Sequence, residues 1–236
     1  MDASRCFVVG ALCALAGGCV SSAQAPNTRG VTLFNSGEYE SARAEFLDAA
    51  AADPVNADAF YNLGSAYHRL DNTIEAERNY THCLALDPNH AKAHHARVVL
   101  LLEEGRANEA YNQVNRWMAQ YSGYPDPMVE LAWLDRQAGK TEQARQQLHQ
   151  VIAMNPRHSR ALTELASLYE SSEENERALA LYQRALAANP NHPDLSNKVA
   201  DLRANTTPGV DRTLAQNPYA PSEPARAGRD MRYQLR

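Results

Sequence analysis

An alanine recurs at a constant interval along this chain. The positions are Ala42, Ala76, Ala110, Ala144 and Ala178. Prolines follow in phase at Pro54, Pro88, Pro156 and Pro190, and Ser122 stands where the missing one would fall. This period of about 34 residues is the length of one helix–turn–helix unit, so the self-similarity indicates a stacked array of such units. Because each unit of an array buries its apolar surface only against its neighbours, we expect surfaces that hold partners.

The charge balance excludes one large class of partners. The 236 residues include 23 Lys and Arg against 28 Asp and Glu, for a formal net charge of −5, and no long run has a single sign. A nucleic-acid-binding domain needs a basic patch or stripe. We therefore expect no nucleic-acid partner.

The N-terminus has the pattern of an export signal. Residues 6–16 form an apolar stretch that is too short for a membrane span of ~20 residues but suits the core of a secretory signal. It leads into Leu15-Ala16-Gly17-Gly18-Cys19, which resembles the lipobox of bacterial lipoproteins. The resemblance implies that residues 1–18 are a signal peptide and that Cys19 is lipidated. Two alternatives stay open: cleavage after Ala23 or Ala25, giving a soluble periplasmic protein, or no processing at all.

The lipobox resemblance also implies a location. Val20 follows the cysteine, whereas Asp at that position is the inner-membrane retention signal, so the resemblance implies the periplasmic side of the outer membrane. Residues 19–26 would form a tether that reaches at most ~25–30 Å when extended. We therefore expect the array to lie close to the lipid surface.

The repeated residues resemble the tetratricopeptide repeat family over about 23–204. The second unit carries the pattern best, with Phe60, Leu63, Gly64, Tyr67, Ala76, Tyr80, Cys83 and Pro88. The resemblance implies an all-α, right-handed superhelical solenoid of about five repeats within residues 27–204. The repeats are expected near 23–56, 57–90, 91–124, 125–158 and 159–192, followed by a capping helix at 193–204. Residues 205–236 contain four prolines and few aliphatic residues, so we expect a disordered tail.

The third and fourth units depart from the family pattern. Arg97 stands where a packing Leu is usual, Trp117 where a small residue is usual, and Asp135 where Tyr is usual. Both units keep the alanine and a turn glycine, Gly105 and Gly139. We interpret them as true repeats with altered packing, in which Trp117 fills space that Arg97 cannot.

Tetratricopeptide arrays typically bind an extended peptide or a helix along a concave face lined by the first helix of each repeat. On this chain the resemblance assigns that face to Tyr61, Asn62, His68, His95, Val99, Leu102, Val129, Trp133 and Arg136. Exposed aromatic and Arg side chains are the usual anchors of an interface, which favours Trp133 and Tyr61. The alternative for Trp133 is packing against the adjacent repeat.

One variant of the family grips a C-terminal carboxylate with Lys and Asn side chains. Asn62 and Lys92 match two members of that clamp, but Asn27, Val31 and Ala96 stand where the others belong. A carboxylate there would be left partly unpaired, so we reject a clamp of this kind.

No motif in the sequence indicates a catalytic site. No Gly-rich phosphate loop or nucleophile elbow occurs, and we expect neither an enzyme, a cofactor nor a small-molecule substrate. His90, His94 and His95 lie close in sequence, but no acidic or thiol ligand completes a metal site, so we interpret them as surface histidines. Cys83 matches small residues of the other repeats and is interpreted as a buried packing residue.

These observations predict a non-catalytic scaffold for protein partners that faces the periplasm. Lipid-tethered arrays resemble pilotin and pilus-assembly lipoproteins, which implies a role in assembling a pilus or secretion complex. The alternatives are an envelope scaffold for cell-wall enzymes and a soluble co-chaperone or adaptor.

Overall fold

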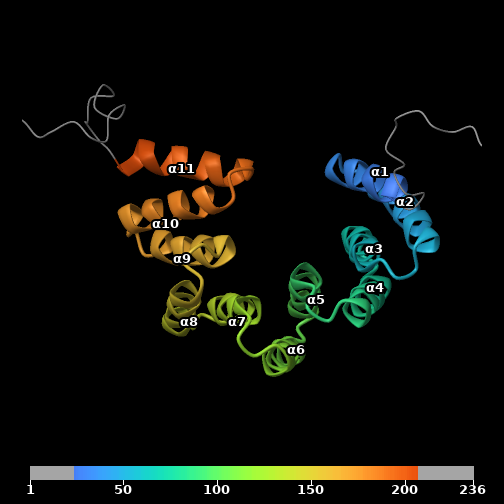
Figure 1. Cartoon of the computed structure of the whole chain (residues 1–236), viewed down its shortest axis with the longest axis horizontal. Helices are drawn as coiled ribbons and strands as arrows, with labels where there is room; N and C mark the ends of the chain where they lie inside the picture. Colours follow the sequence, from blue (N-terminus) through green and yellow to red (C-terminus); the bar gives the residue numbers. More distant parts are fainter. Residues whose placement is uncertain (1–23, 207–236) are drawn as a thin grey trace, which may run out of the picture. The chain divides into compact units, whose positions relative to one another are not determined.

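A computed structural model describes residues 24–206, and every regular element in that range is an α-helix (Figure 1). The helices are α1 Gln24–Asn35, α2 Tyr39–Ala52, α3 Ala57–Arg69, α4 Thr73–Leu86, α5 Ala91–Glu103, α6 Ala107–Gln120, α7 Pro125–Gln137, α8 Thr141–Met154, α9 Ser159–Ser171, α10 Asn175–Ala188 and α11 Pro193–Thr206. The first helices of the second to fifth repeats start at the predicted repeat boundaries, which are Ala57, Ala91, Pro125 and Ser159. The all-α prediction is confirmed.

The described residues form two units, 24–156 with α1–α8 and 157–206 with α9–α11. In the first unit, α1 packs on α2, α3 on α4, α5 on α6 and α7 on α8. Each first helix also contacts the next first helix, α1 with α3, α3 with α5 and α5 with α7. These four helices line one side of the unit, which we call the first-helix face (Figure 1). In the second unit, α10 packs on both α9 and α11.

The turn inside each hairpin uses one residue with positive φ. Glycine occupies it at Gly37, Gly105 and Gly139, with φ of +85°, +74° and +75°. Asp71 and Glu173 hold the equivalent positions with φ of +57° and +62°. Asp71 and Glu173 adopt this left-handed backbone although it is costly for residues that carry a Cβ. The turn therefore has the same conformation in every repeat.

Small residues lie where the two helices of a hairpin cross. All five alanines of the repeating series are 0% exposed. A Cβ added at Gly30 would lie 2.5 Å from Phe46 Cε1, and one at Gly64 would lie 2.7 Å from Tyr80 Cδ1. The two helices of the first and second hairpins therefore cross too closely for a side chain at Gly30 or Gly64.

The structure changes the predicted bounds at both ends of the array. Helix α1 begins at Gln24, so residues 24–26 of the expected tether are helical; Pro26 lies in the first turn, where a backbone N–H has no partner within the helix. Helix α11 continues to Thr206, two residues beyond the expected cap. Leu195, Val199 and Leu202 are buried, as a capping helix requires. The predicted signal peptide, Cys19 and the tail from residue 207 lie outside the described residues.

No helix within residues 24–206 is both long enough and apolar enough to cross a bilayer.

Candidate protein-binding groove

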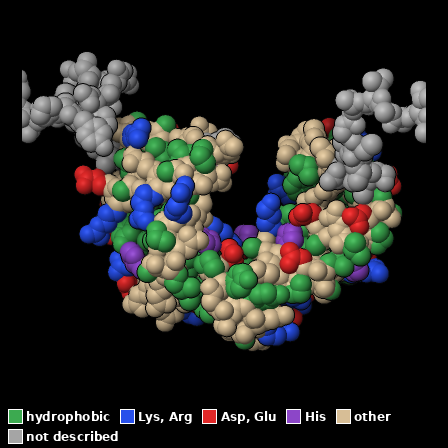
Figure 2. Space-filling view, in the orientation of Figure 1, with side chains coloured by type: hydrophobic (Ala, Val, Ile, Leu, Met, Phe, Trp, Pro, Cys, Tyr) green, Lys and Arg blue, Asp and Glu red, His purple; other side chains and the backbone are tan. Residues whose placement is uncertain are grey.

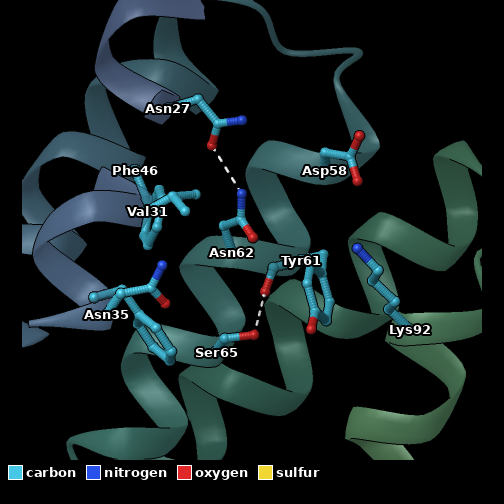
Figure 3. A pocket seen from close by; sticks show the side chains of 10 residues that line it. Asn27, Val31, Asn35, Phe46, Asp58, Tyr61, Asn62, Ser65 and Lys92 are labelled. Carbon is cyan, nitrogen blue, oxygen red and sulfur yellow. Dashed lines mark hydrogen bonds between the residues drawn. The ribbon is translucent and has the colours of Figure 1, made fainter. Parts of the chain in front are cut away.

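A groove of about 420 Å³ opens on the first-helix face between α1, α3 and α5 (Figure 3). Its apolar lining comes from Val31, Phe34, Phe46 and the ring of Tyr61. Its polar lining comes from Asn27, Asn35, Asp58, Asn62, Ser65 and Lys92. The groove therefore combines an apolar floor with amide groups and one charge of each sign.

Two asparagine side chains bridge the first two repeats across this groove. Asn62 Nδ2 donates to Asn27 Oδ1 at 2.9 Å (Figure 3). An amide side chain carries two N–H donors and one acceptor oxygen with two lone pairs. Asn27 keeps its amide donors, and Asn62 keeps its oxygen for a further hydrogen bond. Together they present the same donor and acceptor groups as a peptide bond.

Tyr61 is held against the wall of the groove by its neighbours. Its ring centroid lies 5.2 Å from that of His90. His90 Nδ1 accepts from the Ala93 backbone N–H at 3.0 Å, so Nε2 carries the proton that is shared with Asp58 Oδ1 at 3.1 Å. Burial raises the pKa of the Tyr61 phenol, and the phenol therefore stays neutral at physiological pH.

Lys92 supplies the positive charge of the groove. The side chain is exposed and has no ion-pair partner among residues 24–206. Asp58 lies on the same groove but pairs with His90. An uncommitted ammonium beside amide groups can bind a carbonyl or a carboxylate of a partner. The groove thus offers recognition chemistry for a polypeptide.

Of the partner-binding residues predicted from the sequence, the structure places Tyr61 and Asn62 in this groove. His68 lies between two other side chains instead. Its Nε2 is 2.6 Å from Glu103 Oε2, and its Nδ1 is 3.4 Å from Tyr80 Oη. His68 therefore joins α3, α4 and α5 and has a structural role in this conformation.

The remaining predicted residues lie over α5 and α7, outside the groove. Val129 is 0% exposed, so its assignment to an open binding face is wrong: it is a core residue of α7. Val99, Leu102 and Arg136 are half-buried. Leu102 packs against the apolar cluster that contains Val98 and Leu101.

Trp133 packs against the preceding repeat, the alternative considered for it. It contacts the same cluster as Leu102, and its ring meets His95 edge-on at a centroid distance of 4.7 Å. Trp133 stays half-buried, and its role as an anchor remains a prediction. His95 is half-buried too, with Nδ1 3.0 Å from Oε1 of the fully buried Glu130.

The interpretation of three neighbouring histidines as surface residues is wrong. His90 caps α5 and pairs with Asp58, while His95 pairs with Glu130. His94 is buried, and its ring stacks on Trp117 at 3.9 Å with an angle of 11°. All three link one repeat to another. In residues 24–206 no three His, Cys, Asp or Glu side chains are grouped to hold a metal ion.

The altered packing of the third and fourth repeats is polar. Arg97 donates to Gln113 Oε1 and to Glu77 Oε1, both at 2.8 Å. Asp135 is buried and accepts from Tyr111 Oη at 2.9 Å and from Gln147 Nε2 at 3.0 Å. Hydrogen bonds replace the apolar contacts that Leu and Tyr make in the family pattern.

Cys83 behaves as the sequence predicts. It is a free, fully buried cysteine. Burial raises the pKa of its thiol to about 12, so the thiolate needed for nucleophilic chemistry is not formed at physiological pH.

The sequence prediction missed Asp58, and it considered Lys92 only as part of the rejected clamp. Both occupy the second position of their repeat, where Asp126 and Arg160 stand in the later units. This alternation of acidic and basic residues at the repeat spacing is visible in the sequence. It was a usable signal, because side chains at one repeat position lie on one face of an array.

Stacked helical hairpins with a groove on the first-helix face define a helical repeat protein of the kind that holds other polypeptides. Family models agree: a tetratricopeptide repeat model matches residues 129–193, a TPR repeat model matches residues 30–71, and a further tetratricopeptide repeat model matches residues 57–90. The chain belongs to the tetratricopeptide repeat family. Such proteins are generally non-catalytic scaffolds that bind protein or peptide partners.

Solved structures share the fold. A thermophilic TPR protein of Thermus thermophilus aligns with a TM-score of 0.60 and 23% identity, covering 78% of this chain and all of that one. PilF of Pseudomonas aeruginosa aligns with a TM-score of 0.50 and 20% identity, covering 78% of this chain and 87% of that one.

One curated relative matches by sequence. It is the peroxisomal targeting signal receptor of Kluyveromyces lactis, 26% identical over 110 residues. The match covers 45% of this chain and 19% of the receptor, so less than half of this chain aligns with about a fifth of that protein.

Proposed function

We propose that this protein is a lipid-anchored adaptor on the periplasmic side of the outer membrane, which holds a protein partner during assembly of a pilus or secretion complex. The observation that carries the binding role is the groove between α1, α3 and α5. It presents amide donors and acceptors from Asn27 and Asn62 and the unpaired ammonium of Lys92 beside an apolar floor. These groups match the backbone and side chains of an extended polypeptide.

The location rests on the N-terminal sequence. The apolar stretch and the Gly17-Gly18-Cys19 sequence support processing as a lipoprotein. Because α1 begins at Gln24, only four residues separate it from Cys19, and they reach about 17 Å from the lipidated residue when extended. The groove, which starts at Asn27, would therefore lie near the headgroups, where subunits of an outer-membrane assembly are inserted.

The charge distribution supports a protein as the partner. On the face of the molecule in Figure 2, the charged side chains are separated by uncharged ones, without a large continuous area of either sign. A nucleic acid would need a continuous basic surface. The pilus or secretion role rests on the resemblance to pilotin lipoproteins, with which the fold shared with PilF is compatible.

Metabolic labelling with radioactive palmitate tests the anchor. Wild type should incorporate label and fractionate with the outer membrane, whereas Cys19→Ser should lose both. Cys83→Ala is the matched control, because Cys83 is buried and should not affect labelling. Equal labelling of Cys19→Ser, or a soluble wild type, would contradict the proposed anchor.

Affinity purification from detergent-solubilised envelopes tests the partner. The wild type should recover a secretin or pilus subunit, and the Asn62→Ala, Lys92→Ala double variant should recover much less of it. Recovery of murein enzymes instead would favour the cell-wall scaffold. Equal recovery by both proteins would remove the groove from the proposal.

A further inference from the structure

A further cavity of the first unit is lined mainly by residues of the third repeat. Its volume is about 230 Å³, and it lies between α4, α5 and α6. Leu84, Pro88 and the indole of Trp117 supply apolar walls, while Arg97, Gln113 and Arg116 supply polar ones. The cavity is therefore formed where the third repeat departs most from the family pattern.

The two sites use different faces of the same helix. On α5, Lys92 lines the groove whereas His94 and Arg97 line the cavity. A helix turns by about 100° per residue, so Arg97 is displaced from Lys92 by about 140° around the axis. A single ligand segment that contacts α5 cannot reach both faces of the helix at once. The cavity is therefore a site separate from the groove.

The floor of the cavity is fixed by a chain of hydrogen bonds. Gln113 Nε2 lies 3.2 Å from His94 Nδ1 and 3.1 Å from the His94 carbonyl oxygen, while His94 Nε2 lies 3.1 Å from the Pro88 carbonyl oxygen. His94 is thereby held as a neutral ring, and burial lowers its pKa. Trp117, stacked on that ring, donates from Nε1 to Asn89 Oδ1 at 2.8 Å. The walls are thus in place before any ligand binds.

The charge inside the cavity is positive. Two guanidinium groups line it, and no Asp or Glu does so among the described residues. Arg97 shares Glu77 with Arg106, and its Nε is buried without a hydrogen-bond acceptor. Arg116 donates from Nε to the Asn112 carbonyl oxygen and has no carboxylate partner within residues 24–206. The guanidinium groups therefore keep unused donors.

We propose that this cavity binds an acidic side chain of a protein partner, with an adjacent aliphatic residue against Trp117. A carboxylate is the acceptor that matches a guanidinium fork, and the aliphatic residue would lie between Leu84 and the indole. The site is independent of the groove and of the proposed cellular role.

Nuclear magnetic resonance of the two indole N–H groups tests this proposal directly. The chain has two tryptophans, Trp117 at the cavity and Trp133 on α7, so each signal reports on one region. The full chain carrying Cys19→Ser, which prevents lipid attachment, is titrated with N-acetyl-Leu-Glu-amide. The matched probe is N-acetyl-Leu-Gln-amide, which lacks the charge. The matched protein control is Arg145→Gln, an arginine of α8 away from the cavity.

The expected result is a saturable shift of the Trp117 signal with the Glu probe and none with the Gln probe. Arg116→Gln should weaken binding about tenfold or more, since a hydrogen bond to a charged group is lost, whereas Arg145→Gln should not change it. Circular dichroism should show both variants folded. A Trp117 signal that does not move, moves equally with both probes, or keeps its affinity in Arg116→Gln would overturn the proposal. So would a shift of Trp133 alone.

Discussion

The ring of Tyr80 lies directly against Gly64, where α3 crosses α4. A Cβ at position 64 would lie 2.7 Å from Tyr80 Cδ1 and 3.2 Å from the Ala76 carbonyl oxygen. Tyr80 is 1% exposed, so its ring has little space into which it can move. The hairpin of the second repeat is closed by this contact.

Gly64→Ala should therefore destabilise the protein by about 1–3 kcal/mol through overpacking, measured by urea unfolding. In an uncrowded helix the same change would stabilise the protein by about 0.5–1 kcal/mol. The sign of the change in unfolding free energy therefore shows whether position 64 is crowded. Gly139→Asn is the control: position 139 has φ of +75° and open space around it, and Asn tolerates that backbone. Its effect should be the smaller one, and an increased stability of Gly64→Ala would contradict the packing.

His94 should make stability depend on pH as the pH falls below about 6.5, the ordinary pKa of an imidazole. Burial lowers its pKa below the ordinary 6.5, so in this range the unfolded chain binds the proton more readily than the folded one. Stability is then complete above pH 6.5 and decreases as the pH falls, by at most about 1.4 kcal/mol per pH unit. Unfolding at several pH values in wild type and His94→Gln should show a flatter profile in the variant.

The exposed His82 supplies the control for that experiment. His82→Gln removes one histidine, as His94→Gln does, but at the surface of α4. If His94→Gln and the wild type showed the same slope, the buried neutral ring would not be the cause.

Asp135 should be needed as an acceptor inside the fourth repeat. Asp135→Ala removes the partner of Tyr111 Oη and Gln147 Nε2 and should cost about 1–3 kcal/mol. Asp135→Asn keeps one acceptor oxygen, for Tyr111 Oη, and replaces the oxygen that accepts from Gln147 Nε2 by an N–H donor. Because Gln147 Oε1 is buried without a partner, a rotated Gln147 amide can accept from that donor, and the variant should cost less than Asp135→Ala. Thermal or urea unfolding of the two variants gives the comparison. Because Asn keeps the volume of Asp, equal costs would show that loss of the carboxylate decides, and not loss of the last acceptor oxygen.

The repeat architecture could be predicted because it depends on local rules. The alanines, prolines and turn glycines recur at the repeat spacing, and each fixes a crossing, a helix end or a turn within its own hairpin. The repeat bounds derived from them coincide with the first residues of α3, α5, α7 and α9. Asp71 and Glu173 adopt the same left-handed turn as the glycines, although residue type alone does not require it.

The contacts between repeats were harder to predict, because they depend on which side chains meet across two helices. Histidine and valine both occur at surfaces and in cores, so residue type alone does not decide the burial of His94, His95 or Val129. His94 is buried against the stacked ring of Trp117, and His95 is half-buried beside Glu130. Val129 is fully buried in α7. The groove itself combines residues from separate repeats that are far apart in sequence, Asn27 and Lys92. Of the residues predicted to bind a partner, Tyr61 and Asn62 line this groove, and their role in binding stays a prediction.

Photocrosslinking from the groove tests the central claim most directly. A photoreactive residue replaces Val31, which is 40% exposed in the groove, and in a matched control it replaces Leu47, which is 43% exposed on α2. In living cells, the protein with the probe at position 31 should form one predominant crosslink to a polypeptide, and the protein with the probe at 47 should not. Equal crosslinking from both positions, or from 47 alone, would contradict the groove as the partner-binding site.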